Sequence, residues 1–227
     1  MDQKTEDAVI ELITAREHAQ ALGLLQRELA ANPEDYFSNY HVGVCLRFLG
    51  KIDEAIPYLR TSIRLKPNSS SAHLSLGIAY QLMGQFQPAV MELQKAIELN
   101  NELVEAYNSL GLTYRKMDQP RMALESYEKG LDRLWQLVHR KVHDAPSKCY
   151  RMEPDGTRTV LPFVLSETQR LLKSDVLYSV LCNNAGTCLQ LIGDIEQARE
   201  RFQEAIDCTP EGLDYPDPVA NLRSLEH

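Results

Sequence analysis

The sequence predicts an all-α protein in which pairs of antiparallel helices repeat along the chain. The first observation is a 34-residue spacing of small residues, found at Ala21, Ala55, Ala89 and Ala123 and again at Gly43, Gly77 and Gly111. The second is that Gly186 and Ala198 are both displaced by 75 residues from Gly111 and Ala123, which is one repeat plus 41 residues. Two independent markers thus give one repeat length and one insertion length.

The third observation is the helical period of apolar residues within each repeat. The stretch "YHVGVCLRFLG" predicts one amphipathic helix that ends at Gly50, and "DEAIPYLRTSIRLKP" predicts a second that ends at Pro67. Small residues at Gly43 and Ala55 would let the two helices approach closely where they cross. Large residues recur around them, in one position as Leu46, Tyr80, Tyr114 and Leu189 and in another as Leu59, Leu93, Tyr127 and Phe202.

This pattern resembles the tetratricopeptide repeat family, whose units carry Gly at the eighth position, Ala at the twentieth, a large residue at the twenty-fourth and Pro near the thirty-second. The resemblance assigns clear units to residues 36–69, 70–103, 104–137 and 179–212, and a degenerate unit to 2–35, which has Val9 where Gly is expected. It implies a right-handed α–α superhelical solenoid, a single domain over 1–224. Residues 213–224 would form a capping segment with Asp217 as helix cap, and 225–227, "LEH", resemble a tag remnant.

Residues 138–178 form the insertion. Trp135 stands where Pro33, Pro67 and Pro210 end other second helices, so that helix is expected to continue to "DAPS". The capping box "SETQ" at 166–169 predicts a helix that runs into the last unit, and "PDG" between two β-like runs predicts a hairpin that turns at Gly156. The insertion is therefore expected to hold two helix extensions and a hairpin. Both a stabilising clip and a partner-binding element remain open.

The composition argues against several classes of function. A net charge of −8 disfavours nucleic-acid binding, which needs a concentrated basic face. The N-terminus lacks the basic and apolar pattern of a secretory signal, no apolar run reaches membrane-spanning length, and five cysteines without such a signal indicate reduced thiols. We therefore expect a cytoplasmic protein.

The sequence names no reaction. It has no Gly-rich phosphate loop, nucleophile elbow or His–Glu metal motif, so neither an enzyme nor a cofactor is expected. His139 and His143 lie one helical turn apart with Cys149 near in sequence, but Arg140 and Lys141 favour a solvated basic helix end over a metal site. Cys45, Cys188 and Cys208 occupy positions that hold core residues in sibling units.

The resemblance also implies a concave groove, lined by the first helix of each unit, that holds an extended peptide or a partner helix. The groove positions that we select are Tyr40, His41, Arg47, Gln81, Asn108, Arg115, Lys116, Asn183, Asn184 and Gln190. Asn can satisfy a peptide amide in both senses, and Arg115 or Lys116 could pair with a partner's acidic group. We expect Asn108 and Asn183 to point into one channel. The alternative is that these residues are ordinary surface groups or join neighbouring units by salt bridges.

These observations predict a non-catalytic adaptor or scaffold with a protein or peptide partner. The two-carboxylate clamp of the family's chaperone-binding members is incomplete here, because Glu6 or Tyr40 stands where the clamp has Lys. An alternative function is a structural scaffold that self-assembles through the insertion or the open ends of the solenoid.

Overall fold

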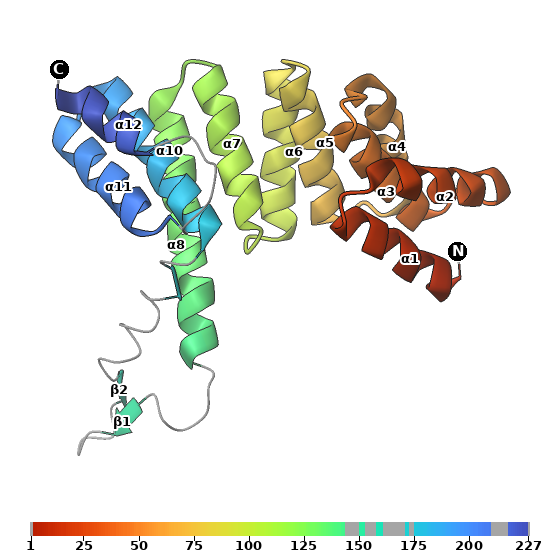
Figure 1. The fold of residues 1–227 in the computed structure, drawn as a ribbon, viewed down its shortest axis with the longest axis horizontal. Coiled ribbons are helices and arrows are strands. Elements are labelled where there is room, and N and C mark those ends of the chain that lie inside the picture. Colours follow the sequence, from red (N-terminus) through yellow and green to blue (C-terminus); the bar gives the residue numbers. More distant parts are fainter. Residues whose placement is uncertain are drawn as a thin grey trace. The chain divides into compact units, whose positions relative to one another are not determined.

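The computed structural model describes residues 2–143, 150–152, 158–160, 171–172, 175–209 and 218–226. Its helices follow one another as antiparallel pairs (Figure 1). The chain divides into two compact units, Met1–Ala106 and Tyr107–His227. Each is considered by itself, and the assignment of one domain to 1–224 stays a prediction.

The first unit is built from three helix pairs. Each first helix packs on the helix that follows it, and α2 on α3 and α4 on α5 continue the stack. The elements are α1 (Gln3–Thr14), α2 (His18–Ala31), α3 (Tyr36–Phe48), α4 (Ile52–Leu65), α5 (Ser70–Leu82) and α6 (Phe86–Leu99), and the start of α7 (Val104–Lys116) closes the unit. The degenerate unit 2–35 is thus a helix pair like its neighbours.

The second unit takes in the rest of α7 and the chain to the C-terminus. Its other elements are α8 (Pro120–His143), β1 (Tyr150–Met152), β2 (Arg158–Val160), α10 (Val176–Ile192), α11 (Ile195–Asp207), α12 (Pro218–Arg223) and the short 3-10 helix η1 (Ser224–Glu226). Helix α10 packs on both α8 and α11, and α12 packs on α11. The predicted capping helix at Pro218 is present.

Glycine at the eighth position of a unit permits close approach of its two helices. A Cβ placed on Gly43 would lie 2.5 Å from Cγ of Leu59, and one on Gly77 would lie 2.7 Å from Cγ of Leu93. Gly111 meets Tyr127 and Gly186 meets Phe202 in the same way. The recurrent small and large residues of the sequence are therefore direct partners in the core, and Leu59, Leu93, Tyr127 and Phe202 are all fully buried.

The fifteenth position of every unit turns the chain from first to second helix through left-handed backbone. Its φ is positive at Arg16, Gly50, Gly84, Asp118 and Gly193, between 57° and 87°. In each case the amide of that residue donates to the carbonyl three residues earlier, and the next amide donates five residues back, as Lys51 does to Leu46. Three units supply the Gly that this conformation favours, whereas Arg16 and Asp118 adopt it with a Cβ.

First helices begin at short polar caps. In four first helices, a side-chain oxygen accepts a hydrogen bond from a backbone amide in the first turn. The caps are Asp2 for α1, Asp35 for α3, Ser69 for α5 and Asp175 for α10. Such caps satisfy amides that have no partner inside the helix.

Helix α8 spans 24 residues and ends at His143, whereas α4 and α6 span 14 residues each. The two strands pair antiparallel, with Arg151 opposite Thr159. Residues 153–157, which hold the predicted turn at Gly156, lie outside the described residues, and so does the capping box at 166–169. The hairpin and the cap therefore stay predictions.

The expectation of one helix from Ser166 into the last unit is wrong. Helix α10 begins at Val176, after Asp175 adopts an extended conformation with ψ of 112°. The Asp175 carboxylate accepts from the amide of Leu177 at 2.8 Å, so it starts a new helix at this point. An Asp can do this because its side chain replaces the missing backbone acceptor.

Buried cysteines have the packing role that the sequence predicts. Cys45 and Cys188 are fully buried in the position that Ala79 and Thr113, also fully buried, take in sibling units. Burial raises the pKa of both thiols to about 11. These thiols are therefore protonated at neutral pH and act as small core residues.

Candidate interaction faces on the first helices

Aromatic and imidazole rings gather on α3 in the first unit. Tyr40 stacks on Tyr36 with ring centroids 6.1 Å apart, and its edge meets His41 at 4.8 Å. The His41 ring also contacts Phe37 at 4.2 Å. These contacts hold Tyr40 and His41, two of the predicted groove residues, as parts of one ring cluster, which we call the α3 ring cluster (Tyr36, Phe37, Tyr40 and His41).

Burial changes the titration of this cluster. Desolvation lowers the pKa of His41 to about 4, so its imidazole is neutral at pH 7. Desolvation also raises the pKa of the Tyr40 phenol, which stays protonated. The face therefore presents neutral rings rather than a charged imidazole.

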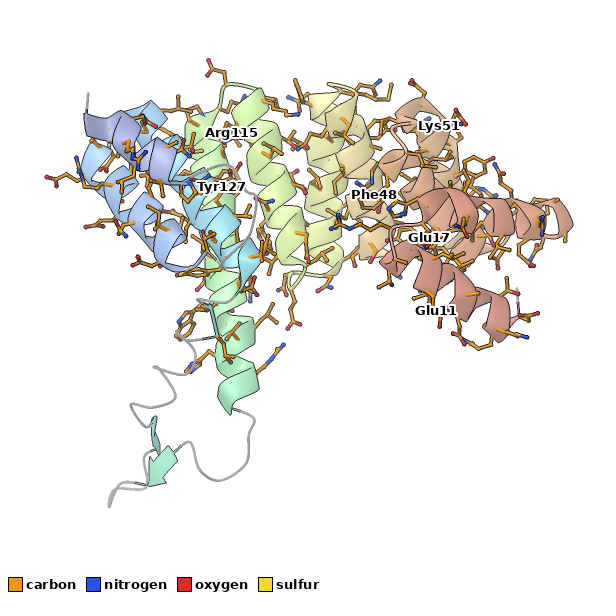
Figure 2. The ribbon with its side chains drawn as sticks, in the orientation of Figure 1. Glu11, Glu17, Phe48, Lys51, Arg115 and Tyr127 are labelled. Atoms are coloured by element: carbon orange, nitrogen blue, oxygen red, sulfur yellow. The ribbon has the colours of Figure 1, made fainter. Side chains whose placement is uncertain are left out.

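A cationic site lies at the C-terminal end of α3. The Arg47 guanidinium carbon is 4.3 Å from the centroid of the Phe48 ring, and His18 of α2 stacks on Phe48 at 4.5 Å and 6°. Phe48 is 56% exposed, although it is a large apolar residue, and Figure 2 labels it. His18 was not predicted as a face residue, because it belongs to a second helix and nothing in its own sequence position points to Phe48.

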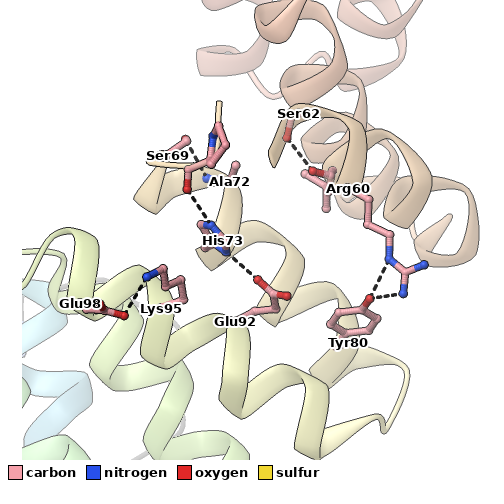
Figure 3. Close-up of polar contacts among 11 residues, drawn as sticks. Arg60, Ser62, Ser69, Ala72, His73, Tyr80, Glu92, Lys95 and Glu98 are labelled. Atoms are coloured by element: carbon pink, nitrogen blue, oxygen red, sulfur yellow. Dashed lines mark hydrogen bonds and ion pairs between the residues drawn. The ribbon is translucent and has the colours of Figure 1, made fainter. Parts of the chain in front are cut away.

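Residues outside the predicted set supply several polar contacts between helices of the first unit (Figure 3), and Tyr40 adds hydrogen bonds to Ser75 and Ser71 of α5. The Arg60 guanidinium of α4 donates to the Tyr80 hydroxyl of α5 at 2.6 Å. The His73 ring of α5 lies 2.6 Å from a carboxylate oxygen of Glu92 on α6 and 3.1 Å from the carbonyl oxygen of Pro67. Arg60 and His73 thus form polar contacts between neighbouring helices. Arg47, in contrast, makes no ion pair within the described residues.

Gln81 does not fit the predicted groove. It is 5% exposed at the end of α5. A side chain that is covered to this extent offers almost no surface to a partner, so its place among exposed groove residues is a wrong prediction.

In the second unit, the expectation that Asn108 and Asn183 share one channel is wrong. The Asn184 amide donates to Oδ1 of Asn108 at 3.1 Å, so Asn108 of α7 pairs with the neighbouring asparagine of α10. Asn183 is 3% exposed, and its Oδ1 accepts from Nδ2 of Asn221 on α12 at 2.8 Å. Gln190 likewise donates to Ser224 at 3.1 Å. The C-terminal residues 221–224 therefore occupy two of the predicted positions.

Arg115 and Lys116 remain on the surface at the end of α7. Arg115 is half-buried near the Cys188 thiol, whose pKa it lowers against the larger effect of burial, and Lys116 is exposed. Neither makes an ion pair to a carboxylate in the part of the chain that the structure describes. Both are consistent with a basic edge on this face.

The hypothetical metal ligands do not form a described site. His139 stacks on Trp135 with ring centroids 4.5 Å apart. The side chain of His143 and the whole of Cys149 lie outside the described residues. Among the residues that the structure does describe, no group of three potential ligands could hold a metal ion.

A hollow of about 750 Å³ in the second unit is lined by Trp135, Tyr178, Glu204, Cys208 and Leu222 among others. The Tyr178 hydroxyl donates to Glu204, and Arg201 donates to the same carboxylate at 2.8 Å. The contact with Glu204 and burial both raise the pKa of Tyr178, burial more strongly. Tyr178 and Glu204, two polar residues that line the hollow, thus bind each other.

Comparison with known proteins agrees with the repeat architecture. Models of the tetratricopeptide repeat match residues 7–70, 70–103 and 104–133, which together span more than half of the chain. No curated protein matches the chain. Similar solved structures include one described as a crystal structure of MamA, with 21% identity over 92% of this chain and 95% of that one and a TM-score of 0.61.

Two further structures share the fold at lower identity. A thermophilic tetratricopeptide repeat protein of Thermus thermophilus, TTC0263, is 16% identical over 99% of this chain and 98% of its own, with a TM-score of 0.63. The pilF protein of Pseudomonas aeruginosa is 15% identical over 92% and 78%, with a TM-score of 0.64.

The fold is that of a repeat protein made of stacked helix pairs. The chain belongs to the tetratricopeptide repeat family. Proteins of this family are typically non-catalytic interaction modules, and the general role of a scaffold for protein–protein interaction extends to this chain. Over the described residues, no helix is long and apolar enough to cross a membrane.

Proposed function

We propose that this chain is a non-catalytic adaptor that binds an extended peptide or a partner helix on the faces formed by its first helices. The observation that supports this most is that Arg47, Arg115 and Lys116 recur at the ends of α3 and α7 and make no ion pair to a described carboxylate. Arg64, by contrast, makes two hydrogen bonds to Glu34, at 2.9 and 2.7 Å. Cationic groups without an internal partner suit recognition of a partner.

The face of the first unit combines the α3 ring cluster with Arg47 and Phe48. Rigid aromatic side chains and arginine are enriched where proteins bind each other. The face of the second unit contributes Arg115, Lys116 and the Asn108–Asn184 pair, whose amides still have free hydrogen-bonding capacity after one mutual bond. Asn183 and Gln190 are not part of this proposal.

Site-specific photo-crosslinking tests the proposal. A photo-reactive phenylalanine analogue replaces Phe48 on α3 or Lys116 on α7, and matched controls carry it at Met91 on α6 or Met122 on α8, which are 70% and 44% exposed. In extract of the source organism, we expect one partner to be captured from positions 48 and 116 and not from 91 and 122. Equal capture from first and second helices would overturn the assignment to the first-helix faces.

A second function, self-assembly as a scaffold, is favoured by apolar residues exposed at the ends of first helices. Phe48, Leu82 and Leu191 occupy the same position of three units and are 56%, 52% and 61% exposed. Surface of this kind is often covered by another protein. Light scattering over a range of concentrations separates the two functions, because self-assembly raises the mass of the pure protein and peptide binding does not require this.

A further inference from the structure

Arg47 is a half-buried cation that the first unit does not neutralise. Its Nε is buried without a hydrogen-bond partner, and its two Nη groups form no ion pair with a described carboxylate. Every donor of a guanidinium is normally satisfied when the group is withdrawn from water, because an unpaired buried charge is costly. Burial accordingly lowers the pKa of Arg47, against a weaker opposing effect of Tyr40.

Other arginines in the same unit show what a satisfied guanidinium looks like here. Arg64 makes a two-bond contact with Glu34, and Arg60 donates twice to the Tyr80 hydroxyl, at 3.0 and 2.6 Å. Arg64 is on the surface, where such a pair adds little. Arg47 is less exposed and would gain more from a carboxylate, yet it has none among the described residues.

The surroundings of Arg47 hold the guanidinium in place for a ligand. The Arg47 guanidinium lies over the Phe48 ring, and the His18 ring stacks on Phe48. A guanidinium that lies on an aromatic ring keeps its N–H edge available for in-plane hydrogen bonds to a carboxylate. The exposed Phe48 offers apolar contact beside this edge.

We propose that Arg47, Phe48 and His18 form a subsite that binds a carboxylate side chain of a partner's peptide together with an apolar residue next to it. The proposal rests on the proposed function and names the chemistry of the partner for the first unit. Local charge complementarity carries it, because Arg47 is a partly buried cation that no carboxylate among the described residues neutralises. The net charge of −8 opposes acidic peptides elsewhere on the chain, so their binding depends on this cation.

Two pools of heptapeptides with blocked ends test the subsite. Their central residue is Glu in one pool and Gln in the other, and the remaining positions are randomised among uncharged residues. The full chain is immobilised, and retention of each pool is measured. We expect the Glu pool to bind about tenfold or more tightly than the Gln pool, because the Arg47 cation then pairs with an ionised carboxylate and not with a neutral amide.

Variants assign the preference to Arg47. Arg47→Met keeps the aliphatic stem and should reduce the Glu-to-Gln ratio to about one, whereas Arg27→Met, on an exposed position of α2, removes the same charge and should leave the ratio unchanged. Arg47→Lys keeps the positive charge and should retain part of the preference for the Glu pool over the Gln pool. If Arg47→Met does not fold, the preference measured for Arg47→Lys tests the role of Arg47 instead. Phe48→Ala should weaken binding of both pools.

Several outcomes would overturn the subsite. They are equal retention of the two pools, a ratio that survives Arg47→Met, retention of neither pool, or displacement of the Glu pool by inorganic phosphate or acetate as readily as by the free Glu peptides. Equal retention would still leave binding on the first-helix faces intact. The crosslinking experiment at positions 48 and 116 judges that broader proposal separately.

Discussion

Gly77 shows how one missing methyl group sets the distance between two helices. A Cβ at this position would lie 2.7 Å from Cγ of Leu93 and 3.3 Å from the carbonyl oxygen of Ala89. The backbone oxygen cannot move away without shifting α6. The position is thus constrained by packing and not by backbone conformation, since no positive φ is found there.

Replacement of Gly77 by Ala is therefore expected to lower the free energy of unfolding by about 1–3 kcal/mol, as overpacking of a core does. Gly23→Ala is the matched control, because Gly23 lies in α2 with nothing within 4 Å of its Cβ position. The control should gain about 0.5–1 kcal/mol from the better helix propensity of Ala. Urea denaturation measures both, and equal effects of the two changes would show that helix approach does not limit this position.

His41 is expected to make the stability of the first unit depend on pH. Its pKa is lowered to about 4 in the folded state, below the ordinary value of 6.5, so the unfolded chain binds the proton more readily. The contribution of His41 to stability is present above pH 6.5 and is lost as pH falls towards 4. The melting temperature should drop over this range, and His41→Gln should drop less. Identical pH profiles for the two proteins would contradict the assignment to His41.

At the scale of elements, the turn between the two helices of a unit is the most regular feature. Both backbone hydrogen bonds recur in all five turns, whether the left-handed residue is Gly or not. The sequence predicts a helix end at Gly50, and Gly84 and Gly193 occupy the same position of their units. Arg16 and Asp118 form the same turn although neither is Gly, because the two backbone hydrogen bonds impose the left-handed conformation. The residue type therefore does not reveal the turn at these two positions.

Arg16→Gly is expected to stabilise the chain by about 0.5–1 kcal/mol. The left-handed region costs a residue with a Cβ about 1–2 kcal/mol, and part of this gain is lost because Gly is more flexible in the unfolded state. Asp118→Gly should gain less, since Asp tolerates this region better. The reverse change, Gly84→Ala, should destabilise by about 1 kcal/mol. Thermal unfolding of the three variants checks the order, and destabilisation by Arg16→Gly would show that its side chain makes a contact worth more than the strain.

At the scale of the whole molecule, the repeat pattern predicts the helix pairs, including the degenerate one, and the extension of α8. These features follow from local periodicity and from contacts within one unit, such as Gly43 with Leu59. The faces were less predictable. Asn183 is covered by Asn221, 38 residues later, and Gln190 contacts Ser224, 34 residues later. Position within a repeat does not reveal which side chain a more distant helix covers.

The same argument explains why Phe48 and His18 were not recognised as a pair. His18 begins a second helix, and Phe48 ends the first helix of the next repeat, so no single amphipathic pattern includes both. Their stacking arises from the packing of α2 on α3. Contacts between neighbouring repeats are therefore the part of the site that periodicity alone does not give.

Deletion of residues 147–162, with a short linker, tests whether the helical array is independent of that segment. The buried side chains that the structure describes belong to residues 9–138, 172–208 and 218, and α10 packs directly on α8 and α11. Since each helix pair in a repeat protein is stabilised by its own core and its neighbours, we expect the variant to keep its helical circular dichroism and to melt cooperatively, within a few degrees of the intact chain.

A longer deletion, residues 147–178, is the matched control. It also removes the buried Leu172, the cap at Asp175 and the Tyr178 hydroxyl that contacts Glu204. The start of α10 then loses both its cap and part of its core, so this variant should melt well below the shorter deletion. If the shorter deletion already abolished cooperative melting, residues 147–162 would have to be part of the core, and the picture of an element attached to a self-sufficient helical array would be wrong.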